Sequence, residues 1–279
     1  MHRENRGQLA GPVSFVRSEV LTSDSCSEYY LEDMSVFGIS GAGYDMSTSI
    51  FSPDGRIFAA EYAKKAVEQG ATSIGILVND GVILLAEKKM MPLQEPDSVE
   101  KISKVDEHVG VATSGFMADA RRLIQEARIK AQSYWLTYEE PIPAETLAEH
   151  ICDIKSLFTL DARGRPFGVA MIIGSVDADS QPRLFVTDPV GTYFGFLAAV
   201  IGRGSTRAGE YLEKQYKRKV KLSQAVGVAL DALRQASETT LTSENVEIAR
   251  IAVNDRQFYR FSRSEIDGFL APPKSEKKP

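Results

Sequence analysis

The chain has 279 residues, of which 43% are hydrophobic and 25% are charged, and its net charge at pH 7 is −5. These proportions are ordinary for a globular protein of one or two domains, and the acidic balance argues against a nucleic-acid partner. No apolar run approaches the roughly 18–20 residues of a membrane span, and the N-terminal residues do not resemble a secretory signal. Cys26 and Cys152 allow at most one bridge, so we expect a reducing compartment.

Residues 1–43 differ in composition from the rest of the chain. They hold scattered serines, glycines and charges without hydrophobic periodicity, which predicts a disordered N-terminal extension. Gly41-Ala42-Gly43 would form a flexible joint after it. The Pro- and Lys-rich residues 271–279 predict a second disordered tail. Residues 44–270 are expected to form one folded domain between them.

The first predicted elements of this domain are a tight turn and a helix. In Ser52-Pro53-Asp54-Gly55, the proline sets φ for the first central position and the glycine tolerates a positive φ. Apolar residues then recur at helical spacing over residues 59–69, and Glu61 and Lys65 are expected to form an ion pair on the other face. Gly70 ends the helix as a C′ residue would.

Strands and helices then follow in blocks. Asp80-Gly81 is a hairpin signal, and the continuous apolar run after it is typical of a strand covered on both faces. The first long helix begins near residue 117 and places Asp119 on its solvent side. Other helices are predicted to begin near residues 145, 205 and 223. Strands are predicted at residues 72–78, 82–86, 99–105, 108–113, 169–176, 183–187, 192–201, 246–253 and 258–261.

The order of elements is hairpins, a helix pair, hairpins, a helix pair and a last hairpin. Sheets that are covered on both faces need helical layers outside two packed sheets. The sequence therefore predicts an α+β fold, a four-layer αββα sandwich. The helix at residues 59–69 has no place in these layers, so we expect it to lie across one end.

A series of motifs runs through the predicted domain. They read Tyr44-Asp45, Phe51 to Arg56, Glu61-Tyr62-Ala63, Gly70 to Gly75, Thr113-Ser114-Gly115 with Ala118-Asp119-Ala120-Arg121, Arg165-Pro166-Phe167-Gly168, Thr187-Asp188-Pro189 and Ile201-Gly202-Arg203-Gly204. In this order they closely resemble the motifs of proteasome α-subunits, archaeal ones in particular. The resemblance implies the Ntn-hydrolase fold, which agrees with the predicted sandwich.

The resemblance raises the question of whether this chain cuts peptide bonds. Ntn hydrolases use a Thr, Ser or Cys at their own N-terminus, with its free amine as the base. Counted from Ile74-Gly75, the nucleophile's position is Ala71, which has no nucleophilic group. Thr72 comes one residue later, where its side chain in a strand points to the opposite face. Glu87 and Lys101 match the acid and lysine partners of active relatives. We therefore expect a non-catalytic subunit.

The α-subunits of the resembled family form heptameric rings that cap proteolytic β-rings, and their N-terminal segments close the axial pore. Tyr44, Asp45, Pro53 and Tyr62 match the family's gate cluster. The Tyr-Asp pair can hydrogen-bond across subunits, and the proline-fixed turn aims the N-terminal tail. Met46 departs from the family's usual arginine. A well-packed turn alone would equally explain Pro53 and Tyr62.

ATPase activators of the family dock their C-terminal tails in a pocket between neighbouring α-subunits. Lys101 matches the lysine of this pocket and would bind the tail's carboxylate, while Gly70 would let the tail approach closely. Lys64 stands where the family often has an arginine. The positive charge is kept, but the paired hydrogen bonds of a guanidinium to a carboxylate are lost. The family's pore-narrowing Tyr-Gly-Gly loop is replaced by Asp161-Ala162-Arg163.

The expected partners are other α-subunits, β-subunits, ATPase activator tails and unfolded proteins in transit. No cofactor, metal, nucleic acid or membrane is expected, and the location is cytoplasmic, or also nuclear in a eukaryotic host. Two alternatives stay open: a processed hydrolase that begins at Thr72, and a scaffold ring without β-subunits. Translation from Met1 or from Met34 is also open, and Met34 would leave a tail of family-like length.

Overall fold

The computed structural model describes residues 50–161 and 164–271. The chain divides into two units, Met1–Gly43 and Tyr44–Pro279, and the described residues all belong to the second. Several predictions fall outside the described residues. They concern the disorder of residues 1–43 and 272–279, the gate residues Tyr44 and Asp45, Met46, and Ala162 and Arg163 of the loop.

Two antiparallel sheets form the centre of the second unit. The strands are β1 (Ser73–Val78), β2 (Gly81–Glu87), β3 (Ile102–Asp106), β4 (Val109–Gly115), β5 (Val169–Val176), β6 (Pro182–Thr187), β7 (Tyr193–Gly195), β8 (Ala198–Ile201), β9 (Val246–Ala252) and β10 (Phe258–Arg260). One sheet has the order β10-β9-β2-β1-β8 and the other the order β3-β4-β5-β6-β7.

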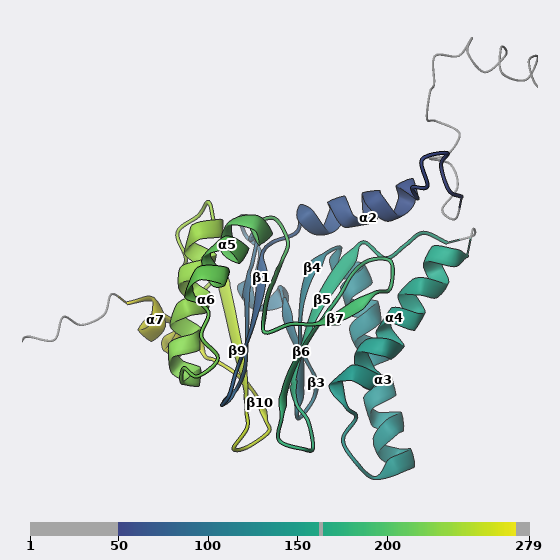
Figure 1. Ribbon diagram of the computed structural model, residues 1–279. Helices are drawn as coiled ribbons and strands as arrows, with labels where there is room; N and C mark the ends of the chain where they lie inside the picture. Colours follow the sequence, from purple (N-terminus) through teal and green to yellow (C-terminus); the bar gives the residue numbers. More distant parts are fainter. Residues whose placement is uncertain (1–49, 162–163, 272–279) are drawn as a thin grey trace, which may run out of the picture. The chain divides into compact units, whose positions relative to one another are not determined.

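Helices cover the outer face of each sheet. The helices are α2 (Phe58–Glu68), α3 (Met117–Tyr138), α4 (Ala144–Leu160), α5 (Ser205–Gln215), α6 (Leu222–Ala236) and α7 (Arg263–Leu270). Figure 1 shows α5 and α6 against the first sheet and α3 and α4 against the second, with the two sheets face to face between them. The predicted four-layer αββα sandwich is confirmed.

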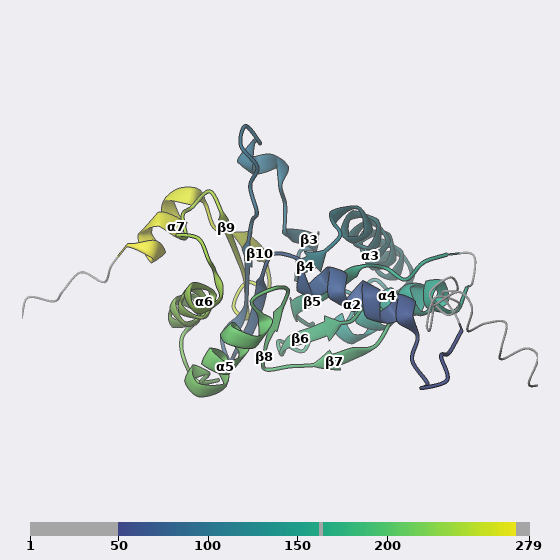
Figure 2. The same cartoon turned by 90° about the horizontal axis from the view of Figure 1, so that it is seen from above.

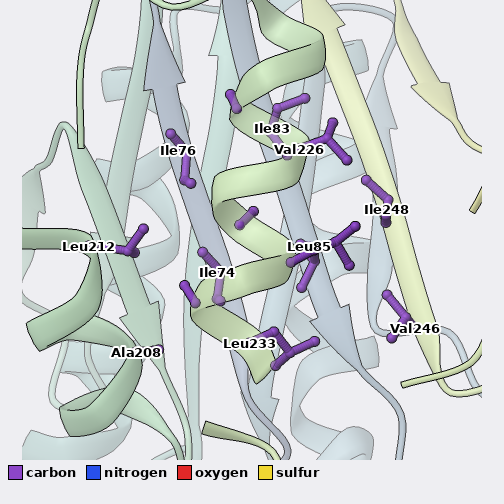
Figure 3. Packing of buried hydrophobic residues seen from close by; sticks show 14 of the residues in the cluster. Ile74, Ile76, Ile83, Leu85, Ala208, Leu212, Val226, Leu233, Val246 and Ile248 are labelled. Atoms are coloured by element: carbon purple, nitrogen blue, oxygen red, sulfur yellow. The ribbon is translucent and has the colours of Figure 1, made fainter. Parts of the chain in front are cut away.

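Strands β1 and β2 explain why the sequence shows unbroken apolar runs. Every residue of both strands is buried, and they pair as a hairpin with Ile76 opposite Ile83. Alternate side chains face opposite layers: Ile83 and Leu85 pack under α6 (Figure 3), whereas Val82 and Leu84 pack between the sheets. Each fully buried side chain of this size stabilises the fold by about 1.5–3 kcal/mol.

The prediction of one strand over residues 192–201 is wrong. This segment forms β7, which pairs with β6 in the second sheet, and then β8, which pairs with β1 in the first sheet. The crossing is fixed at both ends, because the amide of Phe196 donates to the carbonyl of Leu184 at 2.8 Å and that of Leu77 donates to the carbonyl of Leu197 at 2.9 Å. The apolar run is continuous, so only long-range pairing decides where it changes sheets.

The last helix, α7, is a second difference from the prediction. Its start carries a capping box in which the Ser262 hydroxyl accepts from the Glu265 amide and the Glu265 carboxylate accepts from the Ser262 amide. The Ser-x-x-Glu spacing that marks this start is visible in the sequence. Ile266 is the buried residue of this short helix.

Helix α2 lies across the ends of β4 and β5, as predicted (Figure 1). Ala60, Ala63 and Val67 form its buried face. The predicted ion pair between Glu61 and Lys65 is replaced by another: Glu61 binds Arg56 of the preceding turn. Arg56 reaches Glu61 with two nitrogens at once, which a lysine cannot do.

Candidate functional site

The turn before α2 has the geometry that its sequence predicts. Gly55 has a φ of 74°, and its amide donates to the carbonyl of Ser52 at 2.8 Å across Pro53. The amide of Arg56 donates to the Ser52 hydroxyl at 3.1 Å, and the Arg56 side chain binds Glu61. The turn is therefore fixed to the helix that follows it.

Two of the predicted gate residues lie in this region. Pro53 is exposed at the tip of the turn, and Tyr62 is exposed on α2. The Lys65 ammonium lies 5.8 Å from the centre of the Tyr62 ring. Hydrogen bonds from Arg56 hold the pKa of Glu61 below its ordinary value. The gate role of these residues stays a prediction.

Lys101 is buried, although a lysine after a loop would ordinarily be exposed. Its amide and that of Ile102 both donate to the Glu247 carboxylate, at 2.8 and 2.9 Å. Glu247 also forms an ion pair of 2.8 Å with Lys88, so its charge is shared. Burial lowers the pKa of Lys101, and Glu247 opposes this shift in part.

The ammonium of Lys101 has a weak partner. Its Nζ lies 3.8 Å from the sulfur of Met117, and a thioether is a poor acceptor. Among residues 50–161 and 164–271, no carboxylate forms an ion pair with it. A buried cation of this kind would gain a charge-assisted hydrogen bond from an incoming anion.

Gly70 is close to the same segment of chain. A Cβ on Gly70 would lie 2.4 Å from both the Gly115 amide and the Ser114 hydroxyl, so only glycine fits there. Its backbone is not left-handed, in contrast to a typical C′ glycine. The structure therefore brings Gly70 and Lys101 to the two ends of the Ser114–Met117 segment. Lys64 is exposed on α2 and forms no ion pair in the part of the chain that the structure describes.

The sequence prediction missed an ion pair beside this segment. Asp119 was expected on the solvent side of α3, but it is buried and accepts two hydrogen bonds from Arg165, at 2.7 and 2.8 Å. It also accepts one from the Gly168 amide at 2.8 Å. Burial alone would raise the pKa of Asp119, but the bonds from Arg165 and Gly168 outweigh it and the pKa is lowered. The Arg165 guanidinium also lies 5.6 Å from the centre of the Phe116 ring.

Lys155 is a second residue that sequence reasoning missed. It is fully buried in α4, and its ammonium donates to the carbonyls of Val169 and Asp188 at 3.0 Å each and to the Thr187 hydroxyl at 2.8 Å. Burial lowers its pKa to about 8. The only sign of this site in the sequence was a lysine within the apolar stripe of a helix, because its hydrogen-bond partners are far away in the sequence.

Thr72 is the threonine next to the expected nucleophile position, Ala71. Thr72 is buried, and its hydroxyl oxygen accepts a hydrogen bond from the Gly204 amide at 3.1 Å. α2 precedes it without a break, so no free amine stands beside it. The Glu87 carboxylate accepts from the Ser237 hydroxyl at 2.7 Å, and its other oxygen has no partner among the described residues.

Within residues 50–161 and 164–271, no group of three His, Cys, Asp or Glu side chains is placed to hold a metal ion. No helix in these ranges has both the length and the apolar character to cross a membrane.

Comparison with known proteins identifies the family. The family model described as a proteasome subunit matches residues 67–251, and the model of the N-terminal signature of A-type proteasome subunits matches residues 44–66. The proteasome α-subunit of Methanothermobacter thermautotrophicus is 46% identical over 229 residues, which cover 82% of this chain and 92% of that protein. Those of Methanobrevibacter smithii and Pyrococcus horikoshii are each 43% identical, over 239 and 230 residues; the matches cover 85% and 82% of this chain and 95% and 87% of those proteins. The chain therefore belongs to the proteasome subunit family, with its Ntn-hydrolase-like fold, as an α-type subunit of the proteasome core.

Proposed function

We propose that this chain is a non-catalytic subunit of the outer α-ring, which gates access to the proteolytic β-rings and docks ATPase activators. One observation carries the proposal: the turn and α2 stand directly before β1, where a catalytic subunit of this fold needs its own N-terminus. A peptidase of this fold needs a free N-terminus at the start of β1, and here the chain continues from α2 into β1. The turn and α2 instead form a fixed element at one end of the domain, to which the N-terminal segment is attached.

The proposed gating depends on the direction in which the N-terminal segment leaves this turn. Pro53 and Gly55 set the conformation of the turn, and the pair of Arg56 with Glu61 holds the turn on α2. A tail that leaves such a turn starts in one fixed direction. Contact of Tyr44 and Asp45 with a neighbouring subunit would then order the tail over the pore.

Docking of an activator is supported by the surroundings of Lys101. Its ammonium is buried next to a thioether, with Glu247 already shared between Lys88 and two amides. The terminal carboxylate of an activator tail would supply the missing acceptor. Lys64 would add a second positive charge from α2, and Gly70 belongs to the same predicted pocket.

The partners follow from this assignment: other α-subunits in the ring, β-subunits below it, ATPase activator tails above it, and unfolded proteins in transit. We place the complex in the cytoplasm, and also in the nucleus if the host is eukaryotic. A processed hydrolase that begins at Thr72 and a scaffold ring without β-subunits are the competing functions.

Mass spectrometry of the complex purified from its own host tests the proposal. We expect a denatured chain that begins at Met1 or Met34, inside a native particle that also holds a smaller subunit with an N-terminal threonine. A chain that begins at Thr72 would make this protein the protease. A ring that never contains a second kind of subunit would favour the scaffold.

A further inference from the structure

Positive charge is concentrated in the connection between α5 and α6. Five of the eight residues 214–221 are basic, and no Asp or Glu occurs between Glu213 and Asp231. The five basic residues are Lys214, Lys217, Arg218, Lys219 and Lys221. All five are exposed, and none forms an ion pair within residues 50–161 and 164–271. A chain with a net charge of −5 thus carries one surface of unpaired positive charge at residues 214–221, which we call the basic loop.

The basic loop is held in place by hydrogen bonds. The Tyr216 hydroxyl donates to the carbonyl of Leu77 at 2.8 Å, and the amide of Asn79 donates to the carbonyl of Arg218 at 3.0 Å. Leu77 and Asn79 lie at the end of β1, whereas α2 and Gly70 precede its start. The basic loop therefore lies at the opposite end of β1 from the predicted activator site.

The start of α6 makes this charge unfavourable for folding. Lys221 is the N-cap residue of α6, a position where Ser, Thr, Asp or Asn is preferred. The N-terminal end of a helix carries partial positive charge, so it repels cations that lie next to it. The basic loop thus lowers the stability of the folded chain, and an anion bound there would relieve the repulsion.

An apolar pocket bounded by α6 and α7 opens beside the basic loop. Its volume is about 650 Å³, and its apolar lining consists mainly of Leu222, Val226, Phe261 and Phe269. The rings of the two phenylalanines pack edge to face at 5.3 Å. Leu222 directly follows the basic loop, and Asn79, which holds the loop, also lines the pocket. Figure 2 shows α5, α6 and α7 together, on the side of the domain away from α3 and α4.

One cation lies inside this pocket. Arg250 is among the lining residues, and its side chain is 28% exposed. Its guanidinium lies 5.1 Å from the centre of the Tyr259 ring and pairs with Asp255 at 3.4 Å. A guanidinium has five N–H donors, so Arg250 can bind a second carboxylate. Of the described residues that line the pocket, Asp80 alone is acidic.

Charge and apolar lining together define the occupant as an acidic chain that carries a large apolar side chain. Residues 272–279 hold three lysines and one glutamate, so the chain's own C-terminal segment has the wrong charge. A long nucleic acid would match the basic loop, but the rest of this acidic chain would repel it. An acidic peptide segment matches both the basic loop and the pocket.

We propose that the basic loop and the pocket together bind an acidic segment of a partner protein, with one large apolar side chain of that segment in the pocket. The carboxylates of the segment pair with the lysines of the basic loop and with Arg250. The exposed charge pairs guide the partner to the surface, and the buried side chain supplies most of the affinity. The inference does not depend on the proposed ring, because every residue of the surface belongs to one chain.

Fluorescence anisotropy of the full chain with two labelled peptides tests the site. Both peptides consist of aspartates and glutamates around one central residue, which is phenylalanine in one and serine in the other. We expect the phenylalanine peptide to bind at least about tenfold more tightly, because its ring is buried in the pocket. Added salt should weaken the binding of both peptides. Equal affinity for the two peptides would overturn the proposal.

Variants of the protein separate the basic loop from general charge. Lys217→Glu combined with Lys219→Glu should weaken the binding of both peptides at least about tenfold. Arg121→Glu combined with Arg122→Glu, at two exposed residues of α3, changes the net charge equally and is the matched control. Leu222→Gln should remove the preference for phenylalanine and leave the binding of the serine peptide unchanged. Far-UV circular dichroism shows whether each variant is folded.

Two further outcomes would overturn the site. An equal loss of binding in the two double variants would show that only net charge matters. An oligodeoxythymidine of the same net charge as the peptides is the third probe, and we expect it to bind more weakly than the phenylalanine peptide. Tighter binding of the oligonucleotide would assign the basic loop to nucleic acid. Each of these results leaves the proposed ring function standing, since none of them measures assembly or gating.

Discussion

The hydroxyl oxygen of Thr72 accepts a hydrogen bond from the backbone amide of Gly204, 132 residues further along the chain, at 3.1 Å. This bond ties the start of β1 to the residue that caps α5. The threonine that comes nearest to a nucleophile in this sequence is thus a buried structural group. Its oxygen accepts this one bond, and the chain runs from α2 into β1 through this residue.

We predict that Thr72→Ala leaves peptide hydrolysis by the assembled proteasome core unchanged but lowers the free energy of unfolding of the isolated chain by about 1 kcal/mol. Chemical denaturation and a fluorogenic peptide assay measure the two effects. Thr72→Ser keeps the acceptor and is the matched control. Loss of hydrolysis in the alanine variant, with the ring still assembled, would contradict the structural role.

Replacing Lys101 tests activator docking. We expect Lys101→Ala, and the better-packed Lys101→Met, to leave the ring assembled and to abolish activator-stimulated degradation. A charge-assisted hydrogen bond contributes about 1.5–3 kcal/mol, so activator binding should weaken roughly 10- to 150-fold. Lys104→Met is the control, because the Lys104 side chain is partly exposed and pairs with Glu107. Unchanged stimulation in the Lys101 variants would refute the docking role.

The turn before α2 gives a test of gating. Without the proline, Pro53→Ala should loosen the turn by roughly 0.4–1 kcal/mol, which is about a two- to fivefold change in the ordered population of the tail. Hydrolysis of a small peptide without activator should rise by a similar factor, and Tyr62→Ala should act in the same direction. Tyr138→Ala, another exposed tyrosine, should have no effect. Equal basal rates of hydrolysis in all variants would indicate that Pro53 and Tyr62 pack the turn and take no part in gating.

The ion pair of Asp119 with Arg165 gives a prediction on stability. Asp119 is nearly buried and accepts three hydrogen bonds, whereas the Arg165 side chain is 60% exposed. Asp119→Ala should cost roughly 1–3 kcal/mol, because it leaves the buried Gly168 amide without a partner. Arg165→Ala should cost more, roughly 3–5 kcal/mol, because it leaves the buried Asp119 carboxylate without its opposite charge.

The pH dependence of this pair has a defined sign. The pKa of Asp119 is lower in the folded chain than its unfolded value of about 3.9. The ionised Asp119 therefore adds its full contribution to the free energy of unfolding above the unfolded pKa. This contribution is lost as the pH falls through the folded pKa. Urea midpoints at pH 7 and pH 3 should converge between wild type and Asp119→Asn. A constant difference between them would argue against an ionised Asp119.

How far the sequence predicts this structure depends on where the decisive contacts are. The hairpin of β1 and β2 follows from local pattern, since the turn Asp80-Gly81 and the apolar runs are contiguous. The change of sheet at Phe196 and the burial of Asp119 depend on partners more than ten residues away, which periodicity does not encode. In the predicted site, Lys101 and Gly70 lie near one segment, but the burial of Lys101 follows only from the tertiary structure.

Lys155 gives the last prediction, because a fully buried ammonium makes stability depend on pH. Its three acceptors are uncharged, and its pKa of about 8 lies well below the unfolded value of about 10.4. Between these two values the unfolded chain binds more protons than the folded chain, so the contribution of Lys155 to stability rises with pH. The full change is about 3 kcal/mol.

The two ionisable groups that act on Lys155 do not reverse this sign. Burial raises the pKa of the Cys152 thiol to about 11, so it stays neutral over most of the range. Cys152 and Asp188 both raise the pKa of Lys155, but by less than burial lowers it. The difference in unfolding free energy between wild type and Lys155→Met isolates the lysine from tyrosines that titrate at alkaline pH. This difference should change by about 3 kcal/mol in favour of the wild type from pH 7.5 to pH 10.5, whereas the exposed Lys214→Met should show no such change. A flat difference for Lys155→Met would mean that the buried amine keeps the pKa of the unfolded chain and stays protonated over most of this range.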